Sequence, residues 1–147
     1  MKNLKLAERL FQKADKLIRR SKKNKKICFA LFDKAALLGS AKAKYALGTW
    51  YAFGVVVKKD FKKANELFLE AAKSGIPYAQ YDFAVSLALG KGIKKNPKEA
   101  FKWYLKAAKS GEKQSLSELG RCYYYGIGVT CNYKKSAEWY SRAVDSK

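Results

Sequence analysis

The stretch AQYDFAVSLALGKGIKKNPKEAFKWYLKAAKSG, residues 79–111, decides the fold because the chain contains three versions of it. Moved 36 residues toward the N-terminus, it aligns with AKYALGTWYAFGVVVKKDFKKANELFLEAAKSG, residues 43–75. Moved by the same 36 residues toward the C-terminus, it aligns with SLSELGRCYYYGIGVTCNYKKSAEWYSRAVDSK, residues 115–147. A constant period of this length is typical of proteins in which each repeat packs on its neighbours.

The aligned positions predict two helices in every repeat. The first helix, at residues 41–53 in one copy, ends at Gly54, a residue suited to the left-handed conformation that stops helices. The second helix follows Asp60, Asn96 or Asn132, whose side chains can accept a hydrogen bond from the first helical turn. Pro97 suits the first position of such a helix, where a missing N–H costs nothing. Aligned positions form columns, of which one is aromatic or apolar (Trp103-Tyr104 and its equivalents) and one is small (Ala107-Ala108 and its equivalents). These two columns lie three to four residues apart, so they share one helical face.

A weaker copy of the repeat precedes these three. Leu31 and Phe32 align with Leu67 and Phe68, and Gly39 aligns with the glycine that ends the next unit. We therefore expect one all-α domain of about four units and eight helices. Residues 1–40 would form a degenerate N-terminal capping unit, and residues 41–76, 77–112 and 113–147 would form the regular units.

The columns resemble those of the Sel1-like repeat family, which is related to the tetratricopeptide repeats. The residues that carry the resemblance best are Leu119, Gly120, Tyr123, Gly126, Gly128, Val129, Asn132, Trp139, Tyr140 and Ala143. One unit departs from the pattern, because Val56 replaces the second loop glycine and Leu67-Phe68 replaces Trp-Tyr. The resemblance implies a right-handed α-solenoid of antiparallel helix pairs that acts as a protein-interaction scaffold.

The charge of the chain is far from balanced. The 32 basic and 12 acidic residues give a formal net charge of +20. Such a charge favours polyanionic partners, namely nucleic acid, anionic lipid or an acidic protein. A lysine-rich composition that serves only solubility is the other interpretation, and the sequence leaves both open.

The residue types needed for several kinds of chemistry are missing. The chain has no histidine, so neither a Ser/His/Asp nor a Cys/His catalytic arrangement can form. Its cysteines, Cys28, Cys122 and Cys131, show no CxxC spacing, so we expect no metal site and no cofactor. We predict a non-catalytic protein, with Cys28 as a buried small residue and no required bond between Cys122 and Cys131.

The N-terminal segment and the cysteine count bear on the compartment. MKNLKLAERLFQKADK, residues 1–16, is amphipathic and has no apolar core of signal-peptide length, and no apolar run is long enough to cross a bilayer. An odd number of cysteines suits a reducing compartment. We expect a soluble intracellular protein, although export by a route that the sequence does not show stays open.

The basic residues concentrate between the two helices of each unit. In the repeat register, IRRSKKNKKI, residues 18–27, occupies this turn in the first unit. Equivalent turns stack in a repeat protein, so we expect one basic ridge along one edge. The ridge would contain Arg19, Arg20, Lys22, Lys23, Lys25, Lys26, Lys58, Lys59, Lys94, Lys95, Lys134 and Lys135. It would either hold an anionic partner or be a set of solvated turns.

A second candidate surface follows from the resemblance, which implies that the first helix of each pair lines a concave face. The predicted partner-binding residues are Tyr45, Phe53, Tyr78, Tyr81, Leu89, Arg121, Tyr124 and Tyr125. Aromatic residues with an arginine are typical of binding hot spots. We expect a different aromatic set to pack against neighbouring helices: Trp103, Tyr104, Tyr123, Trp139 and Tyr140.

The sequence thus predicts a scaffold that binds a peptide or protein segment of acidic character in its concave groove. The alternative is a binder of nucleic acid or another anionic surface through the basic ridge. Aromatic residues are not interleaved with the loop lysines as base-stacking platforms would be, which makes nucleic acid the second choice. The last unit has no further helix to cover it, so self-association through that unit is also open.

Overall fold

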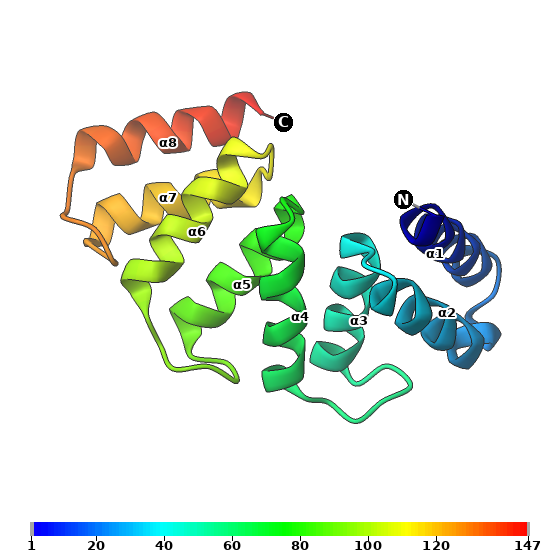
Figure 1. The fold of residues 1–147 in the computed structure, drawn as a ribbon. Coiled ribbons are helices and arrows are strands. Elements are labelled where there is room, and N and C mark those ends of the chain that lie inside the picture. Colours follow the sequence, from blue (N-terminus) through cyan, green and yellow to red (C-terminus); the bar gives the residue numbers. More distant parts are fainter. Residues whose placement is uncertain (1, 147) are drawn as a thin grey trace. The chain divides into compact units, whose positions relative to one another are not determined.

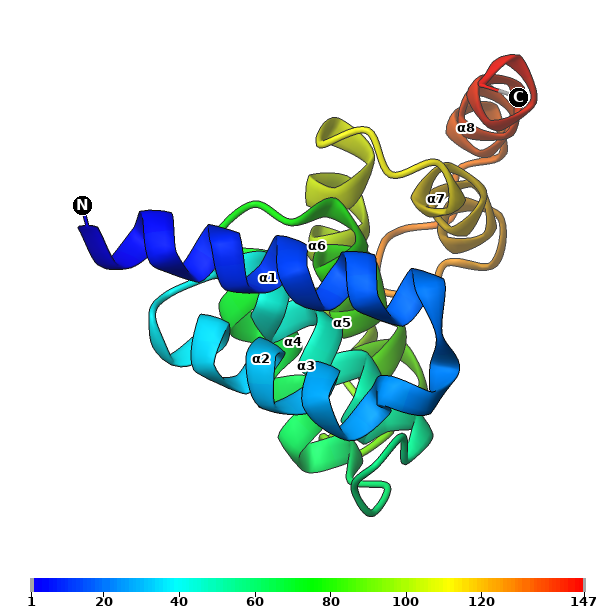
Figure 2. The same cartoon turned by 90° about the vertical axis from the view of Figure 1, so that its right-hand side faces the viewer.

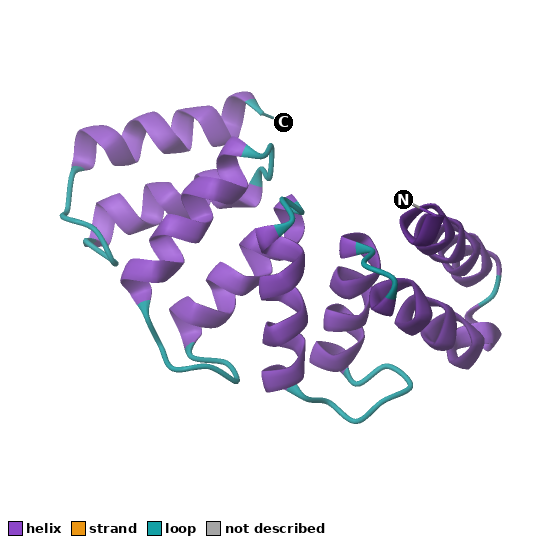
Figure 3. Ribbon diagram, in the orientation of Figure 1, coloured by secondary structure: helices purple, strands orange, loops and turns teal. Residues whose placement is uncertain are grey.

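The computed structural model describes residues 2–146, with the backbone alone for Lys2 and Lys22. Within that range the chain forms α-helices, one short 3₁₀ helix (η1) and no strand (Figure 3). The helices fall into two compact units, residues 1–74 and 75–147. No helix among the described residues is long and apolar enough to cross a membrane.

The first unit contains two helix pairs. Its elements are α1 (Lys2–Arg20), η1 (Lys22–Asn24), α2 (Lys25–Leu37), α3 (Ala41–Phe53) and α4 (Phe61–Lys73). Figures 1 and 2 show α1 and α2 running antiparallel, and α2 also packs on α3. The turn between α1 and α2 is shorter than predicted. Of the basic stretch at residues 18–27, residues 18–20 end α1 and residues 25–27 begin α2, so that the turn itself is Ser21 with η1.

The second unit also contains two helix pairs, and it preserves the sequence period. Its elements are α5 (Pro77–Leu89), α6 (Pro97–Lys109), α7 (Gln114–Tyr125) and α8 (Tyr133–Asp145). The second helices α4, α6 and α8 begin 36 residues apart, at Phe61, Pro97 and Tyr133. The helix pair α5–α6 packs on the pair α7–α8 through α6 and α7.

The predicted helix ends are confirmed. Asp60, Asn96 and Asn132 each accept a hydrogen bond from the backbone N–H three residues later, at 3.0, 3.1 and 2.9 Å. These bonds satisfy amides that would otherwise lack a partner in the first helical turn. Gly54 has the left-handed conformation that the sequence indicates, with a φ of 69°. The repeat register therefore fixes where the first helices stop and the second helices start.

The first helices begin with a different device in each repeat. Ser40 caps α3 by accepting a hydrogen bond from Ala43 N at 3.2 Å, and α5 begins with Pro77. Before α7 the buried Glu112 carboxylate accepts hydrogen bonds from Ser115 N and Ser115 Oγ, both at 2.6 Å, and from Gln114 N at 3.0 Å. A carboxylate in this position is stabilised by the amides and by the positive end of the helix.

Replacing Glu112 by alanine should destabilise the second unit. The substitution removes the acceptor for two backbone amides and for the buried Ser115 hydroxyl. We expect the free energy of unfolding to fall by about 2 kcal/mol, the cost of losing a charged helix cap. Urea denaturation followed by circular dichroism measures it. The control is Glu99→Ala, which removes a solvent-accessible ion pair with Lys102 Nζ at 3.5 Å. This substitution should cost less than about 1 kcal/mol.

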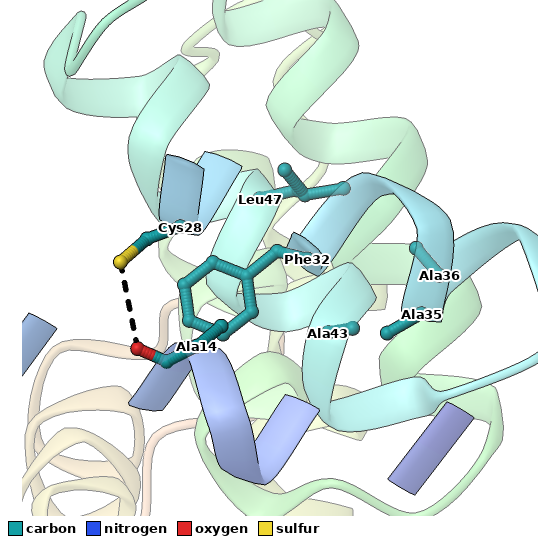
Figure 4. Close-up of a cluster of buried hydrophobic side chains, with 7 residues drawn as sticks. All are labelled: Ala14, Cys28, Phe32, Ala35, Ala36, Ala43 and Leu47. Carbon is teal, nitrogen blue, oxygen red and sulfur yellow. Dashed lines mark hydrogen bonds between the residues drawn. The ribbon is translucent and has the colours of Figure 1, made fainter. Parts of the chain in front are cut away.

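A cluster of buried side chains in the first unit lies between α1, α2 and α3 (Figure 4). Small side chains let the helices approach, and Phe32 fills the space between them, with its ring 5.6 Å from the rings of both Phe11 and Trp50. The Cys28 thiol is fully buried and donates a hydrogen bond to Ala14 O at 3.6 Å. Cys28 is therefore a small core residue, which confirms the prediction from the repeat alignment.

The core of the second unit is more aromatic. The buried Trp103 ring on α6 stands edge-on to Phe83 on α5, with the centroids 5.5 Å apart. Phe101 makes the same kind of contact with Tyr123 on α7 at 5.4 Å. Edge-to-face aromatic pairs at these distances are favourable beyond the area that they bury. Aromatic contacts therefore hold α6 against both α5 and α7.

One loop residue is strained. Val56, between α3 and α4, is the non-glycine residue with a positive φ (67°) among those described. The aligned loops have Gly92 and Gly128, with φ values of 65° and 71°. A β-branched residue is disfavoured in this conformation, because its Cβ crowds the backbone.

Replacing Val56 by glycine should therefore stabilise the first unit. Removal of the Cβ relieves the left-handed strain, and we expect a gain of about 1 kcal/mol in the free energy of unfolding. The gain is smaller than the strain itself because glycine also loses more conformational entropy on folding. The measurement is urea denaturation, and a loss of stability would show that Val56 packing outweighs its strain.

Candidate functional site

Four exposed tyrosines gather on α7 and α8 in the second unit, and we call them the tyrosine surface. They are Tyr124, Tyr125, Tyr133 and Tyr140, with exposed fractions of 48%, 68%, 67% and 40%. The Tyr124 ring lies 4.8 Å from that of Tyr125 and 5.3 Å from that of Tyr133, in both cases edge-on. These contacts hold the rings in place while their outer faces stay in water, so little entropy is lost when a partner covers them.

The loop between α7 and α8 supports this arrangement. The Cys131 thiol donates a hydrogen bond to Tyr124 O at 3.2 Å. A side-chain hydrogen bond with Cys131 also raises the pKa of Tyr133. These contacts connect the loop to the end of α7, which carries Tyr124 and Tyr125, and to the start of α8 at Tyr133.

A charged pair lies beside the tyrosine surface. Arg121 on α7 donates to the Glu118 carboxylate through Nε at 2.9 Å and through Nη2 at 2.7 Å. This hydrogen bond raises the pKa of Arg121, and burial, assisted by the Glu118 charge, raises the pKa of Tyr81. The pKa of Tyr140 is raised by burial and by Tyr125. Arg121 lies one helical turn before Tyr124 and Tyr125 on α7, and it already has an anionic partner in Glu118.

The remaining predicted groove residues differ in their exposure. Tyr45 is half-buried, with its ring 5.8 Å from Phe68, and Tyr81 is half-buried, with its ring 5.9 Å from Tyr104. Phe53, Tyr78 and Leu89 are exposed. Tyr78 and Leu89 stand near opposite ends of α5, about 16 Å apart along the helix. Tyr45 and Phe53 belong to the first unit, so a single groove through both units stays a prediction.

Sequence reasoning misjudged two residues of the tyrosine surface. Tyr140 was expected to be core, and its ring does pack over Gly120, but the side chain is 40% exposed. The equivalent Tyr104 is buried, because α7 packs against the helix α6 that carries it. Tyr133 is not among the predicted binding residues. The sequence does contain a signal for it, since an aromatic residue just after the capping Asn132 lies in the exposed first turn of a helix. Trp103 and Tyr104 are buried, as predicted, and Tyr123 and Trp139 are half-buried.

The predicted basic ridge is exposed wherever its side chains are described. Those exposed side chains are Arg19, Arg20, Lys23, Lys25, Lys26, Lys58, Lys59, Lys94, Lys95, Lys134 and Lys135; the side chain of Lys22 lies outside the described residues. Some cations already have neighbours, because Arg19 pairs with Asp15 at 2.9 Å and Lys135 lies over the Tyr123 ring at 5.4 Å. The ridge draws on both units, so its continuity and an anionic partner for it stay predictions.

The three thiols differ strongly in accessibility, and this gives a direct test of the structure. Cys28 and Cys122 are buried and Cys131 is exposed, and all three are free. Burial raises the pKa of Cys122 to about 11. Because the thiolate is the reactive form, we expect a thiol reagent at neutral pH to modify Cys131 quickly and the other two only after unfolding. Mass spectrometry of the labelled native protein checks this, and rapid labelling of Cys122 would contradict the packing of α7.

The described residues contain no group of three or more His, Cys, Asp or Glu side chains placed to hold a metal ion. Their polar groups are instead engaged in helix caps and in single ion pairs, such as Lys44 with Glu70 at 2.6 Å. The features that stand out on the described surface are exposed aromatic rings and lysines.

The repeat model of a known family covers nearly the whole chain. The model, described as the Sel1 repeat, matches residues 1–14, 19–40, 41–76, 77–112 and 113–147. The chain belongs to the Sel1 repeat family. Sel1 repeat proteins are generally scaffolds for protein–protein interactions and are typically non-catalytic. The resemblance drawn from the columns is thereby confirmed.

Solved structures with Sel1 repeats have the same fold. A protective antigen of uropathogenic Escherichia coli with an SLR fold is 30% identical over 95% of this chain, with a TM-score of 0.90. A Sel1 repeat protein from Oxalobacter formigenes is 27% identical over 95% of the chain, with a TM-score of 0.89. Helicobacter pylori cysteine-rich protein B is 29% identical over 77% of the chain, with a TM-score of 0.67. The fold is an all-α helical repeat solenoid, as predicted.

The chain spans 30% of the length of the Escherichia coli structure and 58% of that from Oxalobacter formigenes. The comparison with curated proteins finds no match. The family and the fold are therefore established for this Sel1 repeat chain, and its own partner must be inferred from its surface.

Proposed function

We propose that this chain is a non-catalytic interaction module that binds a peptide or protein segment on the tyrosine surface of its second unit. The observation that carries the proposal is the group of Tyr124, Tyr125 and Tyr133, whose rings are exposed and yet hold one another at 4.8 and 5.3 Å. Large aromatic groups on a soluble protein that are exposed together mark an interaction site. Tyrosine is also among the residues that contribute most to binding when a partner covers it.

An acidic character of the partner follows from the charge of the chain. A segment with carboxylates is attracted to a molecule of net charge +20 before contact, which speeds association. Beside the tyrosine surface, Lys134 is exposed, whereas Arg121 is paired with Glu118. We therefore expect charge to guide the encounter and the aromatic rings to supply most of the affinity, since exposed ion pairs contribute little.

The test is selection of peptides from a random displayed library on the immobilised chain, followed by fluorescence anisotropy with the purified peptides. The double variant Tyr124→Ala, Tyr125→Ala should bind the selected peptides at least about tenfold more weakly, because two hot-spot rings are removed. The variant Leu37→Ala, which shortens an exposed apolar side chain in the first unit, is the matched control and should bind as the parent does.

Two results would overturn the proposal. One is a selection that enriches no peptide over a blank support. The other is a set of peptides whose affinity is the same for the parent chain and for the double variant. Because both tyrosines are exposed, circular dichroism should show the same helix content and thermal midpoint for the variant, which separates loss of binding from loss of fold.

A further inference from the structure

A hollow with an apolar floor and a basic rim lies in the first unit, whereas the tyrosine surface belongs to the second unit. We call it the lysine hollow. It has a volume of about 550 Å³ and is lined by Lys23, Asn24, Lys25, Lys26, Ile27 and Val56. Ile27 is 56% exposed and Val56 is 44% exposed, so two branched apolar side chains face water beside three cations. It is formed by η1, the first turn of α2 and the loop between α3 and α4.

The repeat register explains why the hollow exists at this loop. Gly128 holds the position equivalent to Val56 two repeats later, and it lies so close to the start of α6 that a Cβ would come within 2.9 Å of Lys98 N and nearer still to Pro97. Pro97 is in turn equivalent to Lys25 at the start of α2. Glycine thus allows the loop to lie on the start of the preceding second helix, whereas at Val56 a side chain occupies this position and lines the hollow together with the start of α2.

The strain at Val56 makes the hollow a specific feature and not a default of the fold. A valine with a φ of 67° costs stability that a glycine would not. The same residue supplies one apolar wall of the hollow, which a glycine would not supply. A strained residue that lines a surface hollow is most simply explained by a ligand that fills it.

We propose that the lysine hollow is a second docking site, and that it binds an acidic peptide segment that presents one branched or aromatic apolar side chain. The apolar side chain would contact Ile27 and Val56, and flanking carboxylates would pair with Lys23, Lys25 and Lys26. The charge of the rim and the apolar floor together define this partner, because a purely charged ligand would leave Ile27 and Val56 in water.

The lining also argues against the other polyanions. A nucleic acid would need flat rings on which bases stack, and the lining residues of the hollow are aliphatic or polar. An anionic membrane favours apolar side chains that protrude from the surface and enter the bilayer interface, whereas Ile27 and Val56 line a concavity. A projecting side chain of a peptide fits a concave site of this size.

The experiment measures fluorescence anisotropy with a short fluorescein-labelled peptide in which one leucine is flanked on both sides by glutamates and aspartates. Binding should weaken about tenfold when the leucine is replaced by alanine, and to a similar degree when the acids are replaced by their amides. The protein variants Val56→Gly and Ile27→Ser should each weaken binding about tenfold. Because Val56→Gly should also raise stability, its loss of binding cannot come from unfolding.

A charge-matched control separates the hollow from the overall charge. The variant Lys25→Glu, Lys26→Glu should abolish binding, whereas Lys94→Glu, Lys95→Glu makes the same change in net charge in another loop and should shift the affinity less than about twofold. The variant Tyr124→Ala, Tyr125→Ala should bind the peptide normally, so failure of this proposal and failure of the tyrosine surface are distinguishable.

Several outcomes would overturn the proposal. They are equal weakening by both charge reversals, equal binding of the leucine and alanine peptides, and absence of binding at low salt to both a leucine-centred and a phenylalanine-centred acidic peptide. Tighter binding of a labelled RNA strand or of phosphatidylserine vesicles, lost in the Lys25→Glu, Lys26→Glu variant, would assign the hollow to that polyanion instead.

Discussion

Replacing Gly128 by valine should destabilise the second unit by about 3 kcal/mol, even though the equivalent loop of the first unit carries a valine. Two costs add. Gly128 has a φ of 71°, where a β-branched residue is strained. Its Cβ would also collide with the backbone of Pro97 and Lys98, which cannot rotate away as a side chain can.

The reciprocal exchange is the control for this prediction. Gly128→Val and Val56→Gly place opposite changes at equivalent positions of the two units, so their effects on the free energy of unfolding should have opposite signs. Urea denaturation monitored by circular dichroism measures both. Equal and small effects would mean that both loops can move away from the preceding helix, and the explanation of the lysine hollow would then fail.

Replacing Trp103 by alanine should cost about 4 kcal/mol, the largest effect expected of a single core substitution in the second unit. Trp103 is buried, its ring stands edge-on to Phe83 at 5.5 Å, and Lys106 Nζ lies 4.1 Å from its centroid. The deletion leaves a cavity between α5 and α6 that neighbouring rings cannot fill without leaving their rotamers.

Trp139 gives the matched control, because it holds the same repeat position one unit later. It is only half-buried, and Arg142 lies over its ring at 4.8 Å. Trp139→Ala should therefore cost about 1 kcal/mol, the value of partial apolar burial with an exposed cation–π contact. A cost for Trp139→Ala that equals that of Trp103→Ala would contradict the difference in packing between α6 and α8.

The features of the fold that depend on local chemistry were predictable from the sequence. Asp60, Asn96 and Asn132 cap helices because a short side-chain oxygen reaches the amide three residues on, and that reach needs no tertiary information. Gly54 ends a helix for an equally local reason. Because the sequence repeats every 36 residues, the same helix caps and helix ends could be predicted in each regular unit.

The features that depend on contacts between elements were not predictable in the same way. Glu112 takes the position that Ser40 holds in the first unit, and its role as a buried cap follows only from the path of the chain between α6 and α7. Tyr140 is exposed whereas Tyr104 at the equivalent position is buried, a difference that arises from contacts between helices and not from the residues themselves. The lysine hollow forms because the loop that contains Val56 lies near the start of α2 at Lys25, and these two segments are distant in the sequence.

The proposed binding of a partner on the tyrosine surface of this Sel1 repeat chain can be tested directly. The measurement is a ¹⁵N–¹H correlation spectrum of the labelled chain, recorded during titration with a peptide selected from the random library. We expect the largest amide shifts on Tyr124, Tyr125 and Tyr133 and on the loop between them, and we expect these shifts to vanish in the double alanine variant. Shifts confined to the first unit, or spread evenly over the lysines, would contradict the claim.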